Sequence, residues 1–302
     1  AKDYKKYNKQ IIDLDKKINT EKEKPEFQIN ELKRRQYLVG LSIEDLELIL
    51  HPMAEDGKEA TGSMGDDTPA AVLSNYYRPI SHYFRQNFSQ VTNPPIDSLR
   101  ENKVMSLKTR FGNLGNILDF DNLTEDNIYV LESPILTNSQ FKKFKSIFKS
   151  KVRVIDCTFD INFSLKDRIE EIRDEAETAV REGSNNLILS DKKINTSRAS
   201  IPSVLAVGAV HSHLVKLGLR GYCSINVESS DTLDTHSFAV LIGVGATTVN
   251  PYLAIDSIYE RYQKKLFNNA DFETCVAKFK KSIDDGLLKI MSKMGISVIS
   301  SY

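Results

Sequence analysis

The sequence predicts an α/β fold made of parallel β/α units, preceded by an irregular and mostly helical part. The first observation is a regular alternation of short apolar strands with helices over residues 150–302. The second is the loss of this rhythm over residues 36–135, where glycines and prolines interrupt short helical patterns. Because crossovers between parallel strands are almost always right-handed, the alternation permits a partial barrel or a wound open sheet.

The second half supplies the expected strands and helices. Polar residues follow the strands at Asp156, Ser190, Asp191, Glu228 and Asn250. In a parallel sheet, the carboxyl ends of the strands form the edge where ligands normally bind. The expected strands span 152–158, 186–190, 222–228 and 246–250, and the expected helices span 164–181, 202–217, 234–241, 254–267 and 271–294.

Residues 1–35 are rich in Lys, Glu and Asp, and we expect them to form a charged helical linker from an upstream domain. An apolar stripe at helical spacing favours a surface helix docked on the rest of the chain, with a short coiled coil as the alternative. Pro25 ends the pattern. The stripe consists of Tyr4, Tyr7, Ile11, Leu14 and Ile18.

Composition excludes several classes of function. Lys plus Arg and Asp plus Glu number 41 each, so the net charge is zero, which argues against nucleic acid as a partner. No apolar run approaches the roughly 20 residues of a membrane span, and the polar start AKDYKKYNKQ does not resemble a signal peptide. We therefore expect a cytoplasmic protein without a membrane partner.

Cysteines and histidines give no sign of a metal site. Cys157, Cys223 and Cys275 lie far apart without a C-x-x-C pair and are expected to be buried, reduced thiols. His211 and His213 are two residues apart on an expected helix, so they point to different faces. No G-x-S-x-G turn accompanies the histidines, and neither a metal ligand set nor a catalytic nucleophile is predicted.

Three other features allow a functional and a structural interpretation. The carboxylates Asp66, Asp67, Asp156 and Glu228 could do acid–base work, but residues of this kind are more often caps or solvated groups. The segment IGVGA, with Gly243 and Gly245, fits a tight helix-to-strand turn, with a flavin phosphate site as the alternative. The lysine-rich face of the expected helix 138–149 is taken as solvated, with an anionic surface as the alternative.

Caps mark the helices of the irregular part. Ser42 with Asp45 caps an expected helix over 43–50, and Thr68 with Pro69 suits the start of a helix over about 72–88. Ser98 with Glu101 forms a further capping box.

Several long strings resemble the central domain of glutamate synthase large subunits. The resemblance runs in order from about residue 36 to the end of the chain. The first two strings are the most specific, because they are long, irregular and rich in Gly and Pro. The strings are HPMAEDGKEATGSMGDDTPAAVLS (51–74), QVTNPPIDSLRE (90–101) with VMSLKTRFG (104–112), LILSD (187–191), NVESSD (226–231) with HSFAVLIGVGATTVNPYLA (236–254), and GLLKIMSKMGIS (286–297).

The resemblance implies a reduced or incomplete TIM-like barrel over 150–302, within a central domain spanning 36–302. It implies a scaffold between an amidotransferase domain and an FMN-binding synthase domain of the same polypeptide, which together make L-glutamate from glutamine and 2-oxoglutarate. FMN and an iron–sulfur cluster are expected in the rest of that enzyme, with none in this chain. An electron-donating subunit or ferredoxin is a further expected partner.

The resemblance also implies residues that line a tunnel for ammonia. Met64 of the GSMG loop and Thr92 of the VTNPP loop match tunnel-lining positions, and Asp66 stands where the family has asparagine. Gly62 and Gly65 are expected to let the backbone approach closely, while Pro94 and Pro95 stiffen the opposing loop. The alternative is that both loops only pack a domain interface.

Two rival functions come from other classes. One is a stand-alone flavin-dependent α/β-barrel oxidoreductase, which would need a phosphate-binding turn and a base at the strand ends. The other is a pure interaction module that uses the charged segment 1–35 as its binding element.

Overall fold

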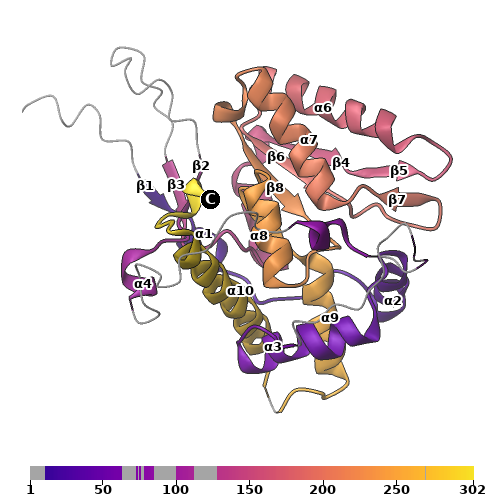
Figure 1. Cartoon of the computed structure of the whole chain (residues 1–302), viewed down its shortest axis with the longest axis vertical. Helices are drawn as coiled ribbons and strands as arrows, with labels where there is room; N and C mark the ends of the chain where they lie inside the picture. The colour runs from indigo at the N-terminus through magenta and orange to yellow at the C-terminus, as the bar shows by residue number, and fades with distance from the viewer. Residues whose placement is uncertain are drawn as a thin grey trace, which may run out of the picture.

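The computed structural model describes residues 11–62, 73, 75, 78–84, 100–111, 128–268 and 270–302. At its centre lies a four-stranded parallel sheet in the order β4-β6-β8-β9 (Figure 1). The expectation of parallel β/α units is confirmed by this sheet. Its strands are β4 (Val152–Asp156), β6 (Asn186–Ser190), β8 (Ser224–Glu228) and β9 (Thr248–Asn250).

One layer of helices covers the outer face of this sheet. The helices α6, α7 and α8 lie in chain order in front of the strands in Figure 1, as right-handed crossovers require. Each begins and ends close to the residues expected from the sequence. Their bounds are α6 (Leu165–Arg181), α7 (Ser203–Lys216) and α8 (Thr235–Gly243), followed by α9 (Tyr252–Gln263) and α10 (Phe272–Met294).

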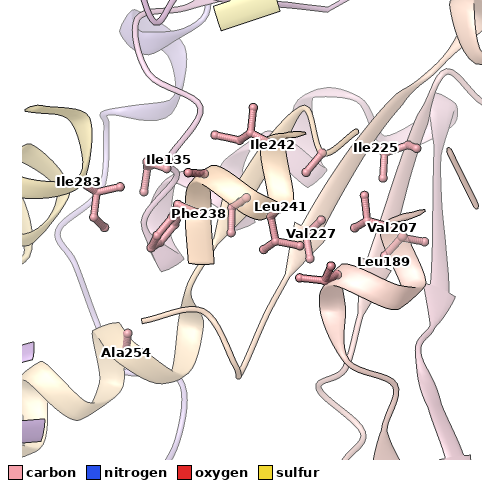
Figure 2. Close-up of a cluster of buried hydrophobic side chains, with 14 of the residues drawn as sticks. Ile135, Leu189, Val207, Ile225, Val227, Phe238, Leu241, Ile242, Ala254 and Ile283 are labelled. Carbon is pink, nitrogen blue, oxygen red and sulfur yellow. The ribbon is translucent and has the colours of Figure 1, made fainter. Parts of the chain in front are cut away.

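The main core fills the space between these helices and the outer face. Side chains alternate along a strand, so Leu189 of β6 and Val227 of β8 point toward the helices (Figure 2). Val207 of α7 and Phe238 of α8 meet them there, both fully buried. Because α7 and α8 are apolar on nearly all sides, they pack against neighbours on more than one side.

Helix α5 (Asn138–Ile147) lies over the opposite, inner face of the sheet. It begins with a capping box in which Thr137 and Gln140 exchange hydrogen bonds. Phe141 and Phe144, as expected, lie on one side and are buried, in a cluster that includes Ile188 of β6. This contact fixes the helix against the inner face.

A second, three-stranded sheet borders α5. It has the order β1-β3-β2, with β1 parallel and β2 antiparallel to β3. Phe111 of β2 and Leu131 of β3 join the aromatic cluster of α5. The bounds are β1 (Ile11–Asp13), β2 (Thr109–Phe111) and β3 (Ile128–Leu131).

The expected helical stripe is wrong where the structure describes it. Ile11 belongs to strand β1, and only the single turn α1 (Asp15–Ile18) is helical. Leu14 and Ile18 are buried as the stripe suggested, but they contact the aromatic cluster of α5. Pairing of β1 with β3, more than a hundred residues away, overrides the local helical spacing.

Most of the other helices of the irregular part pack near α9 and α10. Ser42 and Asp45 form the expected cap, and the helix that follows continues to Gly57, which adopts a φ of 67°. The bounds are α2 (Ile29–Leu38), the π-helical η2 (Asp45–Leu50), α3 (His51–Asp56), η4 (Ile80–Tyr83), α4 (Glu101–Val104), η5 (Lys149–Lys151), β5 (Thr158–Asp160) paired antiparallel with β7 (Arg198–Ser200), η6 (Arg220–Tyr222) and η7 (Ile299–Ser301).

Among the described residues, no helix has the length and apolar character needed to cross a membrane.

Candidate functional site

Most residues predicted to line a tunnel lie outside the part of the chain that the structure describes. These residues are Met64, Gly65, Asp66, Thr92, Pro94 and Pro95, together with Asp67, Thr68, Pro69 and Ser98. Gly62 is described and exposed, and a Cβ built there would meet no described atom within 4 Å. The close approach expected at Gly62 is therefore not seen among the described residues, and the other roles stay predictions.

The polar residues expected at the strand ends do meet at one edge of the sheet. Ser190 of β6 is in register with Glu228 of β8, which is in register with Asn250 of β9. Asp191 follows directly, and its main-chain N–H points to the carbonyl of Glu228. The sequence therefore predicted the location of this carboxyl edge correctly.

The inner face of the sheet is polar although it is buried. Asn226 of β8 donates to Ser224 and to the carbonyl of Leu187, and its side-chain oxygen accepts from Thr248. Ser224 also donates to Asn186. A buried polar group without a hydrogen-bond partner is costly. These side chains can be buried because they form hydrogen bonds with one another and with the main chain.

Glu228 carries a buried negative charge at the centre of the edge. Its Oε1 lies 2.6 Å from Nζ of Lys145 on α5 and 2.8 Å from Nζ of Lys192 after β6, while its side chain is only 2% exposed. Burial opposes ionisation, but the charges of Lys192 and Lys145 outweigh it and lower the pKa of Glu228. Glu228 is held ionised and paired on both sides, which leaves it unsuited to act as a general base.

This pairing corrects the expected solvated face of the helix over 138–149. Lys145 is the lysine of that face that turns inward, toward Glu228 and over the ring of Phe141. A buried carboxylate from a distant strand made the difference, and helical spacing alone carries no sign of it.

Two further carboxyl groups are buried at the same edge. Burial and the nearby charge of Asp231 raise the pKa of Asp191 to about 7, although Ser230 donates two hydrogen bonds to it. Burial likewise raises the pKa of Asp256 on α9 to about 7. Both groups are fixed by hydrogen bonds to the protein itself.

The chain covers this edge with its own N-terminal part. We call residues 19–28, which link α1 to α2, the strap. The main-chain N–H groups of Glu26 and Phe27 donate to Asp256, and the Glu26 carboxylate pairs with Lys192 at 2.5 Å. Phe27 lies against the ring of Tyr252. The place where a ligand binds in many parallel sheets is thus occupied by protein.

The space that remains at the edge is about 10 Å³. It is lined by Asp191, Glu228 and Cys157, among others, and Oδ1 of Asp191 has no hydrogen-bond partner among the described residues. A cavity of this size suits a single water molecule, whereas organic ligands occupy cavities of several hundred Å³. A flavin therefore does not fit among the described residues of this edge.

Asp156, at the end of β4, serves the β5–β7 pair. Its Oδ1 accepts from the hydroxyl and N–H of Thr158, and Oδ2 lies 3.2 Å from Arg198 and 3.3 Å from Lys193. All of these partners belong to adjacent loops or strands. Asp156 therefore has a structural role, and its contacts are explained without a substrate.

The segment IGVGA forms the expected tight turn. The N–H of Ala246 donates to the carbonyl of Leu241 and that of Gly245 to Ile242, the pattern of a glycine-terminated helix. Gly245 has a φ of 120°, and a Cβ there would lie 2.3 Å from Nδ1 of His211. These N–H groups are therefore used inside the turn, which leaves no cradle for a phosphate.

His211 and His213 have partners within the protein, and the cysteines are free thiols. His213 pairs with Glu177, and His211 accepts from Arg220. The three cysteines are buried and unpaired, as expected. Within the described residues, no group of three or more His, Cys, Asp or Glu side chains could hold a metal ion.

A large hollow of the described surface lies elsewhere, between α6 and α7. It is a groove of about 810 Å³ that η4 borders with Ile80 and Phe84. Its floor is apolar, and Phe163 and Tyr83 close to it are half or more exposed. No pattern that we interpreted in the sequence predicted this groove, although α7 is apolar on more sides than the sheet can cover. The floor is formed by Leu165, Ile169, Val204, Leu205, Gly208, Ala209 and Val244.

The model of the family described as "Glutamate synthase central domain" matches residues 34–302. The chain belongs to this family. The glutamate synthase [NADPH] large chain of Azospirillum brasilense is 58% identical over 275 residues, which cover 90% of this chain and 18% of that protein. The corresponding large chain of Bacillus subtilis is 42% identical, covering 92% of this chain and 18% of that protein.

Relatives with a different name match the same region. The chloroplastic ferredoxin-dependent glutamate synthase of Oryza sativa is 42% identical over 89% of this chain and 18% of its own length. The chain thus spans about a fifth of the relatives that it matches. Among solved structures, a flavocytochrome b2 mutant with benzoylformate aligns at a TM-score of 0.35 and 15% identity, over 53% of this chain and 36% of that one. That likeness is too low to carry an inference.

Proposed function

We propose that this chain is the connecting domain of a glutamate synthase that makes L-glutamate from glutamine and 2-oxoglutarate. It holds an amidotransferase domain and an FMN-binding synthase domain of the same polypeptide in register and has no catalytic centre of its own. The observation that carries the proposal is the family match over residues 34–302. The two large chains of glutamate synthase that match this chain are much longer, and the chain covers only 18% of each.

The carboxyl edge of the sheet supports a scaffold role. Its central carboxylate, Glu228, is neutralised by two lysines, and the strap covers the position that a substrate would take. An enzyme of the β/α class keeps a concave, accessible site at this edge. FMN and the iron–sulfur cluster belong, in this proposal, to the rest of the polypeptide.

We further propose that the β/α half is an incomplete TIM-like barrel. Ile135, which precedes α5 and β4 in the chain, forms a parallel bridge with Val249 of β9, at the far end of the sheet from β4. In a closed barrel, the segment before the first strand of the sheet pairs with the last strand. Here the segment at Ile135 precedes β4 and pairs with β9, which is the beginning of such a closure. Helix α5 then lies over the inner face, where the sheet remains open.

The ammonia path is proposed to run along the loops of the irregular part. Met64, Asp66 and Thr92 are its proposed wall residues: Met64 and Thr92 match tunnel positions of the family motif, and Asp66 takes the neighbouring position, where the family has asparagine. The domain boundary near residue 35 and the cytoplasmic location remain parts of the same proposal.

The apolar groove between α6 and α7 supports contact with another domain of the polypeptide. The groove of about 810 Å³ has an apolar floor with exposed Phe163 and Phe84 beside it, a surface on which apolar side chains of another domain could pack. The electron donor is proposed to act elsewhere, since relatives named for NADPH and for ferredoxin match the same region.

The first experiment assays the purified chain for glutamine hydrolysis, for 2-oxoglutarate reduction and for flavin absorbance. We expect neither activity and no bound flavin. Turnover in either assay would refute the scaffold role, and bound flavin would favour a stand-alone oxidoreductase. Binding of a foreign partner by residues 1–35 alone would favour the interaction module.

The second experiment uses the intact enzyme. We expect Thr92→Val and Met64→Ala to increase the glutamine hydrolysed per glutamate formed, because ammonia would escape before the second reaction. Thr92→Ser, which keeps the hydroxyl, is the matched control. An unchanged ratio in Thr92→Val and Met64→Ala would favour the interpretation of both loops as interface packing.

A further inference from the structure

One buried carboxylate joins the strap to the sheet. Asp256 on α9 is fully buried. Its Oδ2 accepts from the main-chain N–H of Glu26 at 2.9 Å and of Phe27 at 2.8 Å, and its Oδ1 accepts from Nδ2 of Asn138 at 2.9 Å. Because main-chain donors cannot rotate away, these N–H groups hold the carboxyl group of Asp256 at a fixed place on the strap.

The same carboxylate reaches the sheet through Asn138. Oδ1 of Asn138 accepts from Nδ2 of Asn250, the last residue of β9, at 2.9 Å, and that amide also donates to the carbonyl of Leu136. Four segments therefore meet at Asp256: the strap, the start of α5, the end of β9 and α9 itself. All side chains in this chain of contacts are buried.

The strap also makes contacts that do not involve Asp256. Glu21 and Lys143 lie 3.6 Å apart and are both exposed by a third or more, so the pair contributes little. Glu23 accepts from Ser139 at the start of α5, and the Glu26 carboxylate pairs with Lys192. In Figure 1 the indigo segment runs from α1 across the molecule to α2, and Asp256 binds it at Glu26 and Phe27, just before α2.

We propose that Asp256 is a positioning residue that locks the strap to the carboxyl edge of the parallel sheet. It thereby fixes the path that the strap takes across this edge between α1 and α2. The inference rests on the proposed function, in which two active centres in other domains must keep their relative placement. Asp256 touches no substrate and acts only through the strap.

The first measurement is hydrogen exchange on the full chain. Asp256→Asn keeps the size of the side chain but replaces one acceptor oxygen with an N–H donor. We expect the amides of Glu26 and Phe27 to exchange about 10- to 100-fold faster, with core strands unchanged. Asp284→Asn is the matched control, because Asp284 is a partly buried carboxyl on α10 that accepts from Ser133 instead.

The second measurement is the glutamine hydrolysed per glutamate formed in the intact enzyme. We expect the ratio to rise about twofold or more in Asp256→Asn, since small misplacement of reacting centres has large kinetic effects, and to stay at the wild-type value in Asp284→Asn. If Asp256→Asn does not fold, Asn138→Ala removes one of the three donors and is expected to shift both readouts in the same direction.

Three results would decide against this assignment. Unchanged exchange at Glu26 and Phe27 would show that Asp256 does not hold the strap. Faster exchange with a wild-type ratio would show that the strap does not position the active centres, and equal uncoupling in Asp284→Asn would reduce the effect to general destabilisation. A wild-type enzyme that forms no glutamate would instead refute the proposed function and leave the exchange result standing.

Discussion

Gly286 on α10 lies where the helix crosses the start of α8, and a methyl group added there should destabilise the fold. A Cβ at this position would lie 2.5 Å from Cγ2 and 2.8 Å from Oγ1 of Thr235, which is the first residue of α8 and is buried. Carbon atoms in contact normally stay 3.5–4.0 Å apart, so the overlap is about 1 Å. Thr235 is β-branched and buried, so its side chain has little room to rotate away.

Two opposing contributions set the size of the effect. Replacing glycine by alanine within a helix stabilises it by about 1 kcal/mol. Overpacking a filled interface costs about 1–3 kcal/mol. Because a contact of 2.5 Å is closer than real Cβ atoms come, the overpacking should cost about 2–3 kcal/mol, in the upper part of this range. We therefore expect Gly286→Ala to lower the free energy of unfolding by about 1–2 kcal/mol.

Thermal unfolding of the chain is the assay, with Gly208→Ala as the matched control. Gly208 lies within α7, and a Cβ there would meet no described atom within 4 Å. Gly208→Ala should therefore stabilise the chain by about 0.5–1 kcal/mol. Thr235→Ala should rescue Gly286→Ala by about 1 kcal/mol, since it removes both clashing atoms. A Gly286→Ala variant as stable as the wild type, or one that Thr235→Ala does not rescue, would refute the reasoning.

Three further predictions concern the carboxyl edge and the aromatic cluster. Glu228→Gln should destabilise the chain by about 2–4 kcal/mol in urea unfolding, because Lys145 and Lys192 lose a buried, charged partner. The control Glu170→Gln removes an exposed pair with Arg173 and should change stability by about 0.5 kcal/mol or less. Burial raises the pKa of Asp191 and Asp256 to about 7, so the folded state binds protons more tightly than the unfolded chain, and stability should fall as pH rises from about 4 to about 7. Each carboxyl should contribute on the order of 1 kcal/mol less at pH 8 than at pH 6, and the difference between melting temperatures at these pH values should shrink in Asp191→Asn with Asp256→Asn; an unchanged difference would contradict the assignment. Phe144→Ala should cost about 3–5 kcal/mol in thermal unfolding, because the ring is fully buried 4.8 Å from that of Phe148; a loss below about 1 kcal/mol would contradict this packing.

The sequence by itself determined the β/α half and the family. Strands such as NLILS over 186–190 and the apolar helix after them follow from local hydrophobic spacing, which a sheet covered by helices requires. The caps at Ser42 and Asp45 and the turn at Gly245 are equally local. The ordered strings that resemble the glutamate synthase central domain lie within the residues that the family model matches.

Only the tertiary structure decided which partner each buried polar residue contacts. Lys145 looked like one lysine of a solvated face until Glu228, 83 residues later in the chain, proved to lie beside it. The strap met Asp256 across 229 residues, and no local pattern in either segment indicates that contact. Ile11 became a strand for the same reason. Pairings between distant segments depend on how the whole chain folds back on itself, so spacing along the sequence determines the elements but not their partners.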